Sequence, residues 1–560
     1  MKKISWIIAV TIIVAALSGC GGESAKTENT NEYERLSYDE AVHELDALYG
    51  DIKPKEISPR LDVDMTNGTV ASSLASIDTF PIEEGGGEID IEIAAATEFS
   101  SDEPDDWLKV VAEKFNRSNN TVNGKTVSVS VRTITSGEVV TYMTEGGYRP
   151  DCYIPSNDAW GQMLDAKSIK TIKVTDRIAG NTAGILMKKT VYDQFIEKYE
   201  EVTVANVLEA ANNGDIIFAY TNPYTSSTGL NILSSMLYAF DNNNPLSDEA
   251  ASKLIEYQKN APTAAYNTAI LTNSATKGII DAMVMEEQAY INELELRDYV
   301  FTPAGIRHDH PVYTFDYVSD EKQEVVKMFV EYCLTDEMQK LATQRGFNRH
   351  DDYKSQENGM DGNGYFAAQR VWKQNKNGGR PVIAVFVSDI SGTMYGTRIN
   401  ALKQSLLSTM QYISSDCYVG LVSYDDTVYI NLPVRQFDDQ QRAYFSGAVK
   451  DLDTKGGKTA TYDATIVGMK MLLEAQEQNP DAKLLLFVLS DGDQNYGYRL
   501  SRIAPIVGGL NIPIYTIGYE MPENGEKELN QLSDINEAAT ISADVDGIVN
   551  ELRNLFNVNM

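Results

Sequence analysis

A nearly unbroken apolar run, Pro381 to Ser388, narrows the folds open to the C-terminal part of this 560-residue chain. Such a run is typical of a parallel strand that helices bury on both faces. Apolar residues then recur at helical spacing from Ile399 to Ile413. Further strands are predicted at 417–424, 427–432, 484–490 and 512–517, and a last helix is predicted with Asp544 as its N-cap. This alternation predicts a doubly wound, mainly parallel α/β sheet.

Three polar segments lie at the predicted carboxyl ends of these strands. They contain Asp389-Ile390-Ser391-Gly392-Thr393, a loop from Lys455 to Asp463 with Thr459 and Thr461, and Asp491-Gly492-Asp493. In an open α/β sheet such strand ends meet at one crevice, where ligands bind. The side chains gathered there are carboxylates and hydroxyls without His or Cys, a set suited to Mg²⁺ or Mn²⁺. Because few of these groups are anionic, a carboxylate of a partner protein could complete the coordination of the ion.

Residues 381–560 resemble a von Willebrand factor type A (VWA) domain, and the three segments resemble its metal-ion-dependent adhesion site. The resemblance implies a metal site made of Asp389, Ser391, Thr393, Thr459 and Asp491. Lys458 is interposed in the family's usual Gly-Gly-Thr pattern, so Thr461 stays open as the alternative ligand to Thr459. Near a cation, Lys458 would weaken metal binding unless it points to solvent. A VWA fold without a metal is the other reading.

The N-terminal half also alternates between strand and helix patterns, with a strand at Ile89–Ala95 and a helix at Asp105–Asn116. Residues 88–350 resemble bacterial extracellular solute-binding proteins of the two-lobed clamshell type. The segments that carry the resemblance are 97–101, 149–157, 221–229 and the closing helix at 325–344.

Hydroxyl groups cluster where helices of this half are predicted to begin, at Ser136 and at Thr225, Ser226, Ser227 and Thr228. Backbone N–H groups, hydroxyl donors and the positive end of a helix dipole together suit a small anionic solute. A helix cap with surplus hydroxyls is an equal alternative. His308-Asp309-His310 could bind zinc only with ligands from elsewhere in the chain, and a solvated turn is favoured.

The N-terminus reads as a secretory signal. Lys2 and Lys3 precede an apolar run from Ile4 to Leu17, which is too short to span a membrane. The run ends in Leu17-Ser18-Gly19-Cys20, which resembles the lipobox of bacterial lipoproteins. The resemblance implies a lipid-modified Cys20, and hence a protein on the extracytoplasmic face of a bacterial cell membrane that is held by its lipid alone.

The predicted domain order is a signal peptide at 1–19, a tether or stalk at 20–87, a solute-binding domain at 88–350, a linker at 351–380 and a VWA domain at 381–560. A formal charge of −33 disfavours nucleic acid as a partner. Motifs for a catalytic nucleophile, a zinc protease or a phosphate loop do not occur, so an enzyme is not expected. The sequence favours a binding protein with an adhesion or assembly role, and the receptor of an ABC-type importer with an accessory VWA domain is the alternative.

Overall fold

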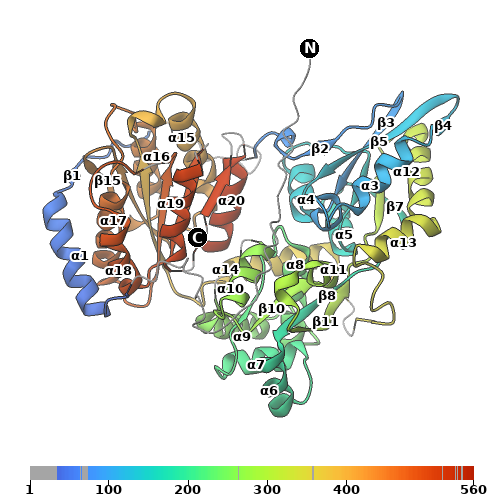
Figure 1. Ribbon diagram of the computed structural model, residues 1–560, viewed down its shortest axis with the longest axis horizontal. Helices are drawn as coiled ribbons and strands as arrows, with labels where there is room; N and C mark the ends of the chain where they lie inside the picture. The colour runs from blue at the N-terminus through green and yellow to red at the C-terminus, as the bar shows by residue number, and fades with distance from the viewer. Residues whose placement is uncertain are drawn as a thin grey trace, which may run out of the picture.

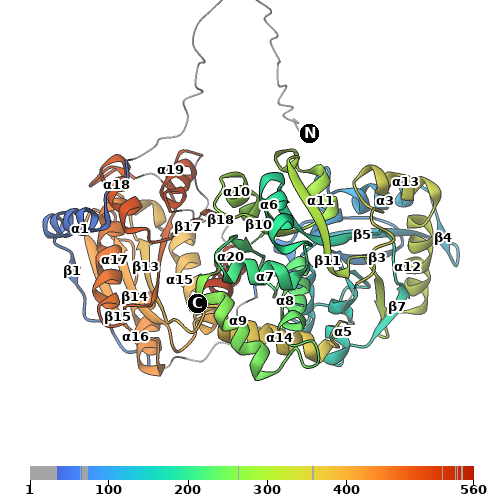
Figure 2. The ribbon, with the colours of Figure 1, turned by 90° about the horizontal axis from the view of Figure 1, so that it is seen from below.

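The computed structural model describes residues 34–560 except 64, 66–73, 263, 266, 356–358, 493, 520, 522, 537, 539 and 544–546. The predicted signal peptide, Cys20, the first part of the tether, Asp493 and the predicted N-cap Asp544 lie outside the described residues. Within the described part of the chain, no helix is both long enough and apolar enough to cross a membrane. Figures 1 and 2 show two α/β bodies side by side, one of which is divided into two lobes.

The C-terminal body is built on a seven-stranded sheet in the order β1-β15-β14-β13-β16-β17-β18. Its strands are β1 (Lys55–Glu56), β13 (Val382–Asp389), β14 (Tyr418–Tyr424), β15 (Val428–Gln436), β16 (Lys483–Ser490), β17 (Ile514–Tyr519) and β18 (Thr540–Ala543). Neighbouring strands are parallel except for β14 and β15. Every residue of β13 is buried, as the apolar run predicts. The doubly wound sheet is confirmed.

Helices cover both faces of this sheet, and alternate residues of β13 contribute to two separate cores. One face carries α17 (Thr461–Gln476), α18 (Leu500–Leu510) and α19 (Glu523–Asp534). The other carries α15 (Thr397–Thr409), α16 (Asp439–Lys450) and α20 (Ile548–Asn559). Short 3₁₀ turns, η4 (Gly392–Met394) and η5 (Met410–Tyr412), flank α15.

Residues 34–63 belong to this body and do not form the predicted stalk. Helix α1 (Tyr38–Ile52) begins at a Ser37 capping box and buries Leu45 and Leu48 in the core with α17 and α18. Strand β1 then pairs in parallel with β15 at the edge of the sheet. In Figure 1, blue α1 lies against orange α17 and α18, although about 400 residues separate them in sequence. An apolar helix face needs a partner, and the sequence alone does not name it.

The N-terminal body has two lobes. Lobe 1 contains a seven-stranded sheet with β2 (Ile82–Glu83), β3 (Ile89–Ala95), β4 (Thr121–Val122), β5 (Lys125–Thr133), β6 (Cys152–Ile154), β7 (Thr171–Thr175) and β12 (Val312–Phe315). Lobe 2 contains a four-stranded sheet with β8 (Thr182–Lys188), β9 (Phe218–Ala219), β10 (Ala282–Glu286) and β11 (Tyr299–Arg307). The chain crosses between the lobes at residues 176–181 and again at 308–311. The predicted clamshell is confirmed, and β2 places the start of lobe 1 before residue 88.

The helices of lobe 1 are α2 (Thr97–Ser100), α3 (Trp107–Asn116), α4 (Ser136–Thr144), α5 (Asp158–Ala166), α12 (Asp320–Cys333) and α13 (Asp336–Gln344). Those of lobe 2 are α6 (Lys189–Tyr199), α7 (Val204–Asn212), α8 (Ser227–Phe240), α9 (Asp248–Asn260), α10 (Thr268–Thr276) and α11 (Glu287–Asn292). Two 3₁₀ turns, η2 (Ile77–Thr79) and η3 (Leu294–Leu296), complete the N-terminal body.

The predicted linker at 351–380 contains a helix, α14 (Gly362–Asn375), which buries one face against α5, α8 and α9. Asp361 caps this helix, accepting from the Gly364 N–H at 2.7 Å. Trp372 is fully buried, and its indole N–H donates to Tyr220 at 2.8 Å. The Gly and Asn content of this segment indicated a linker, but packing against the rest of the fold stabilises a helix here. Helix propensity does not measure such packing.

Candidate metal centre and solute cleft

The first predicted metal loop follows β13 directly. Asp389 is fully buried, and its carboxylate accepts from the Ser391 N–H at 2.8 Å and from the Ser490 hydroxyl at 2.7 Å. Burial raises the pKa of Asp389 to about 6, against the opposing effect of these two hydrogen bonds. A cation at this carboxylate would favour its ionised form.

Four of the five predicted metal ligands form one hydrogen-bonded chain. The Ser391 and Thr393 hydroxyl oxygens lie 3.0 Å apart, and Thr393 donates to Asp491 Oδ1 at 2.9 Å. Arg398 Nη1 lies 2.8 Å from the other oxygen of Asp491. The guanidinium therefore offsets the charge of Asp491, and Asp389 carries the least compensated negative charge of the set. An all-oxygen set of this kind fits Mg²⁺ or Mn²⁺.

The second loop lies against the first, since the Gly392 N–H donates to the Gly457 carbonyl at 3.4 Å. Thr459 is buried, and its N–H donates to Asn495 Oδ1 at 2.9 Å. The Thr461 hydroxyl instead lies 3.2 Å from the buried Tyr424 hydroxyl. This contact engages the Thr461 hydroxyl with Tyr424, and Thr459 and Thr461 both stay candidates for the ligand from this loop.

Lys458, the residue interposed in the usual pattern, is exposed. Its Nζ lies 5.3 Å from the centre of the Tyr496 ring. The ammonium thus has an aromatic partner at the surface. This position weakens the expected repulsion between Lys458 and a bound cation.

The five hydroxyl residues predicted for an anion line one cavity of about 380 Å³ in the N-terminal body. Ser226 caps α8 by accepting from the Gly229 N–H at 3.2 Å, and its hydroxyl lies 2.9 Å from that of Thr228. The Ser227 hydroxyl accepts from the buried Trp160 indole at 2.9 Å. Ser136 pairs with Ser156 at 3.3 Å. Most of these hydroxyls therefore have protein partners, as the helix-cap alternative predicts.

The same cavity is lined by three carboxylates, Glu98, Asp105 and Glu286, and no Lys or Arg lines it among the residues described. Burial raises the pKa of Asp105 to about 6, and the charges of Glu98 and Glu286 act in the same direction. Burial and the charge of Glu98 also raise the pKa of Glu286. This concentration of negative charge disfavours the predicted anionic solute.

The prediction of a solvated turn at His308-Asp309-His310 is wrong for the two histidines, which are not exposed to solvent. Both are fully buried on the second crossing between the lobes. His310 Nε2 lies 3.1 Å from Glu98, and His308 Nδ1 lies 2.6 Å from Glu286. Burial alone would lower the pKa of His310, but its hydrogen bond to Glu98 and the nearby charges raise it overall. The sequence pattern favoured a solvated turn for His308-Asp309-His310, and it could not name Glu98 and Glu286 as the partners, because they lie far away in the chain.

Comparison with known families matches both halves of the chain. Residues 384–555 match the von Willebrand factor type A domain, and residues 97–348 match the bacterial extracellular solute-binding protein family. The inter-alpha-trypsin inhibitor heavy chain H3 of Bos taurus is 28% identical over 156 residues. That segment is 25% of this chain and 17% of the bovine protein, so the match covers only about a sixth of the curated relative.

Solved structures resemble each body separately. A von Willebrand factor type A protein from Catenulispora acidiphila is 20% identical, with a TM-score of 0.27, over 32% of this chain and 42% of that chain. The sulfate-binding protein SubI from Mycobacterium tuberculosis H37Rv is 14% identical, with a TM-score of 0.35, over 47% of this chain and 88% of that chain. By the two family matches, the chain contains a domain of the bacterial extracellular solute-binding protein family at residues 97–348, followed by a von Willebrand factor type A domain at residues 384–555.

Proposed function

We propose that this is a lipid-anchored extracytoplasmic binding protein whose VWA domain binds a protein carboxylate through Mg²⁺ or Mn²⁺. The metal would be held by Asp389, Ser391, Thr393, Thr459 and Asp491. The observation that carries the proposal is the hydrogen-bonded chain from Asp389 through the Ser391 N–H and the Ser391 and Thr393 hydroxyls to Asp491 at the carboxyl edge of the sheet. When bound, the ion supplies an electrophilic centre for a carboxylate oxygen.

The protein's own residues prepare this site in two ways. The Ser391 N–H and the Ser490 hydroxyl fix the orientation of the Asp389 carboxylate. Arg398 neutralises Asp491 at 2.8 Å, which reduces the negative charge that an incoming carboxylate would meet. The first arrangement orients a ligand of the metal, and the second favours an anionic partner over a neutral or cationic one.

The metal is tested on the full chain by Mn²⁺ titration calorimetry. We expect one site lost in Asp389→Ala and kept in Asp426→Ala, which removes an exposed aspartate from the loop after β14. Water-proton relaxation of the Mn²⁺-loaded protein then tests for an open coordination position, with acetate as the carboxylate probe. A fall in relaxation on adding acetate supports carboxylate binding, and unchanged Mn²⁺ affinity in Asp389→Ala contradicts the metal assignment.

The proposed lipid anchor is attached to Cys20, and the lipobox-like sequence that ends at Cys20 supports it. Cys20→Ala should move the protein from the membrane fraction to the soluble extracytoplasmic fraction. Substitution of Cys152, a buried thiol in β6, is the control and should leave the fractionation unchanged. Membrane retention of Cys20→Ala would contradict the anchor.

The importer alternative is favoured by the cavity of about 380 Å³ between two lobes, a geometry that suits a small ligand. Solute uptake by cells that carry Asp389→Ala separates the two functions. If deletion of the gene lowers solute uptake and expression of the Asp389→Ala variant restores it, the importer alternative is supported. Metal-dependent attachment that is lost in Asp389→Ala supports the adhesion function.

A further inference from the structure

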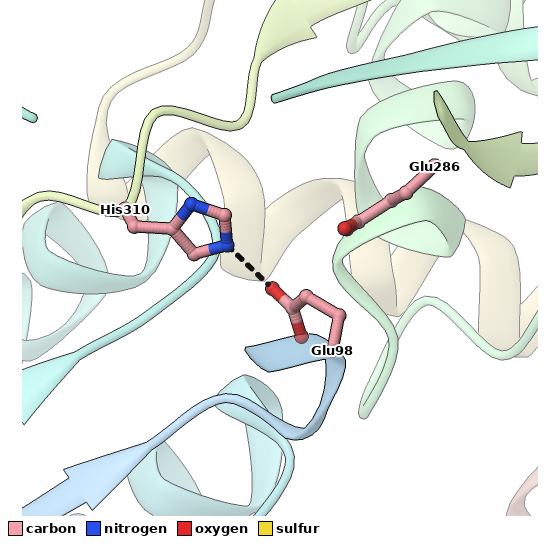
Figure 3. A group of neighbouring side chains, drawn as sticks. All are labelled: Glu98, Glu286 and His310. Carbon is pink, nitrogen blue, oxygen red and sulfur yellow. Dashed lines mark hydrogen bonds and ion pairs between the residues drawn. The ribbon is translucent and has the colours of Figure 1, made fainter. Parts of the chain in front are cut away.

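We propose that the cleft between the two lobes binds a divalent transition-metal cation through Glu98, Glu286 and His310. Figure 3 shows the three side chains converging from different parts of the fold. Their ligand atoms all lie within 4.8 Å of one another. The site does not share residues with the VWA metal centre and does not depend on the function proposed for that centre.

The three ligands come from both lobes and from the connection between them. Glu98 lies in α2, directly after β3 of lobe 1, and Glu286 ends β10 of lobe 2. His310 lies on the second crossing. A cation bound by all three would therefore join the lobes, as a ligand of a clamshell does.

The imidazole of His310 is held with Nε2 toward the cleft. Its Nδ1 lies 2.9 Å from the Ala179 carbonyl oxygen. Because a carbonyl oxygen can only accept a hydrogen bond, Nδ1 carries a proton. Ring contacts with Phe99 and Phe347, at 4.4 and 5.5 Å between centroids, restrict rotation of the imidazole. In this structure Nε2 shares a proton with Glu98, and a metal would replace that proton, because the neutral imidazole is the form that binds metals.

Both carboxyl oxygens of Glu286 are held by hydrogen-bond donors. Asn157 and Asn231 both donate from Nδ2 to His308 Nε2 at 3.1 Å, so the proton of His308 resides on Nδ1. Backbone contacts fix the orientation of both amides. His308 Nδ1–H then donates to Glu286 at 2.6 Å, and Asn181 Nδ2 donates to its other oxygen at 2.8 Å. Supporting hydrogen bonds of this kind orient the ligands in metal sites.

The cleft has an excess of negative charge that a cation would offset. Glu98, Asp105 and Glu286 line the cavity, and the basic groups that contact them are imidazoles, His308 at Glu286 and His310 at Glu98. Gln288 donates from Nε2 to Asp105 at 2.6 Å, and its amide oxygen has no hydrogen-bond partner within the described residues. Buried carboxylates in such excess are ordinarily paired or bound to a metal.

The donor set selects the class of cation. One imidazole nitrogen and two carboxylates suit Zn²⁺, Mn²⁺ or Fe²⁺ better than Ca²⁺ or Mg²⁺, which prefer oxygen alone. Metal–ligand bonds of about 2.0–2.2 Å place neighbouring ligand atoms about 3 Å apart. The 3.1 Å between His310 Nε2 and Glu98 already meets this spacing. Glu286 lies within 4.8 Å of the other two ligand atoms, and a shift of its carboxylate toward them would complete the site.

The test uses the full chain carrying Asp389→Ala, so that the VWA centre does not contribute. Zn²⁺ and Mn²⁺ are titrated by calorimetry, and Co²⁺ is added as a probe whose visible spectrum reports nitrogen ligation. We expect one site per chain in the Asp389→Ala background, weakened at least about tenfold by His310→Gln or by Glu286→Gln. The matched control is His43→Ala, an exposed histidine on α1, which should change neither affinity nor spectrum.

Each result decides the inference. Loss of the Co²⁺ spectrum in His310→Gln, with an unchanged near-UV circular dichroism spectrum, supports ligation by this imidazole. If His310→Gln fails to fold, Glu286→Gln, which keeps the shape of the side chain, is measured in its place. The inference is overturned if the Asp389→Ala protein binds none of the three metals, or if binding persists in both Gln variants. Stabilisation of the protein by an organic amine but by no metal would also overturn it.

Discussion

Thr459 and Thr461 lie two residues apart, but their hydroxyl groups have different environments. The Thr461 hydroxyl contacts buried Tyr424 at 3.2 Å, while the Thr459 backbone is held by Asn495 beside the first metal loop. We expect Thr459→Ala to weaken Mg²⁺ binding by about tenfold, because a ligand oxygen is lost. Thr461→Ala should cost about 1 kcal/mol of stability and leave the Mg²⁺ affinity nearly unchanged. Calorimetric titration and thermal unfolding measure the two effects, and the reverse order would assign the ligand to Thr461.

Lys376 is a buried amine at the end of α14, and its Nζ has no hydrogen-bond partner among the described residues. Burial and the charges of Lys373 and Lys483 lower its pKa well below the ordinary 10.5, while Asp416 and Cys417 oppose them. Between the lowered pKa and 10.5 the unfolded chain binds one more proton than the folded chain. Stability therefore rises with pH across this range and is lowest below the folded-state pKa.

We expect Lys376→Met to remove this pH dependence. It should stabilise the protein by about 1–3 kcal/mol near neutral pH, because an unpaired polar group is replaced by an apolar one. The gain should shrink above the ordinary pKa of lysine, where both states are deprotonated. Denaturant unfolding from pH 6 to 11 measures it, with Lys327→Met on the exposed face of α12 as the control. An equal gain at every pH would show that Lys376 does not titrate on unfolding.

At the scale of elements, α1 shows what the sequence could and could not predict. The amphipathic pattern of residues 37–48 predicts a short helix, and α1 runs from Tyr38 to Ile52. Its partners, α17 and α18, could not be predicted, since spacing reveals an apolar face but not what covers it. The predictions of a linker around α14 and of a solvated turn at His308 and His310 were wrong for the same reason. In both places, segments distant in sequence bury the residues.

Leu45 tests whether α1 is part of the VWA domain. Its side chain is fully buried in the core with α17 and α18, so Leu45→Ala should destabilise the C-terminal body by about 2–4 kcal/mol. His43→Ala on the exposed face of the same helix should change stability by less than about 0.5 kcal/mol. Urea unfolding of the full chain measures both. Equal, small effects would mean that α1 behaves as part of a stalk.

At the scale of the whole molecule, one helix joins the cleft to the VWA domain. Helix α4 begins at Ser136 in the cleft, and two of its later residues contact α20. Glu138 accepts from Arg553 at 3.1 Å and from Asn554 at 3.0 Å, and the Tyr142 hydroxyl donates to Asn550 at 2.9 Å. The same helix thus lines the solute cavity and packs on the last helix of the other domain. The two domains are expected to unfold as coupled units.

Glu138 carries this coupling, because it is buried and faces the buried guanidinium of Arg553. Glu138→Ala leaves the Arg553 charge uncompensated in the interface, which should cost about 3–5 kcal/mol of domain association. We expect scanning calorimetry to resolve two transitions in place of one, and hydrogen exchange to accelerate in α20. Glu145→Ala, at the exposed end of α4, is the control and should change neither. If Arg553→Leu in the Glu138→Ala background restores a single transition, the loss arises from the unpaired charge and not from α4 itself. A single transition already present in Glu138→Ala would show that other contacts hold the two domains together.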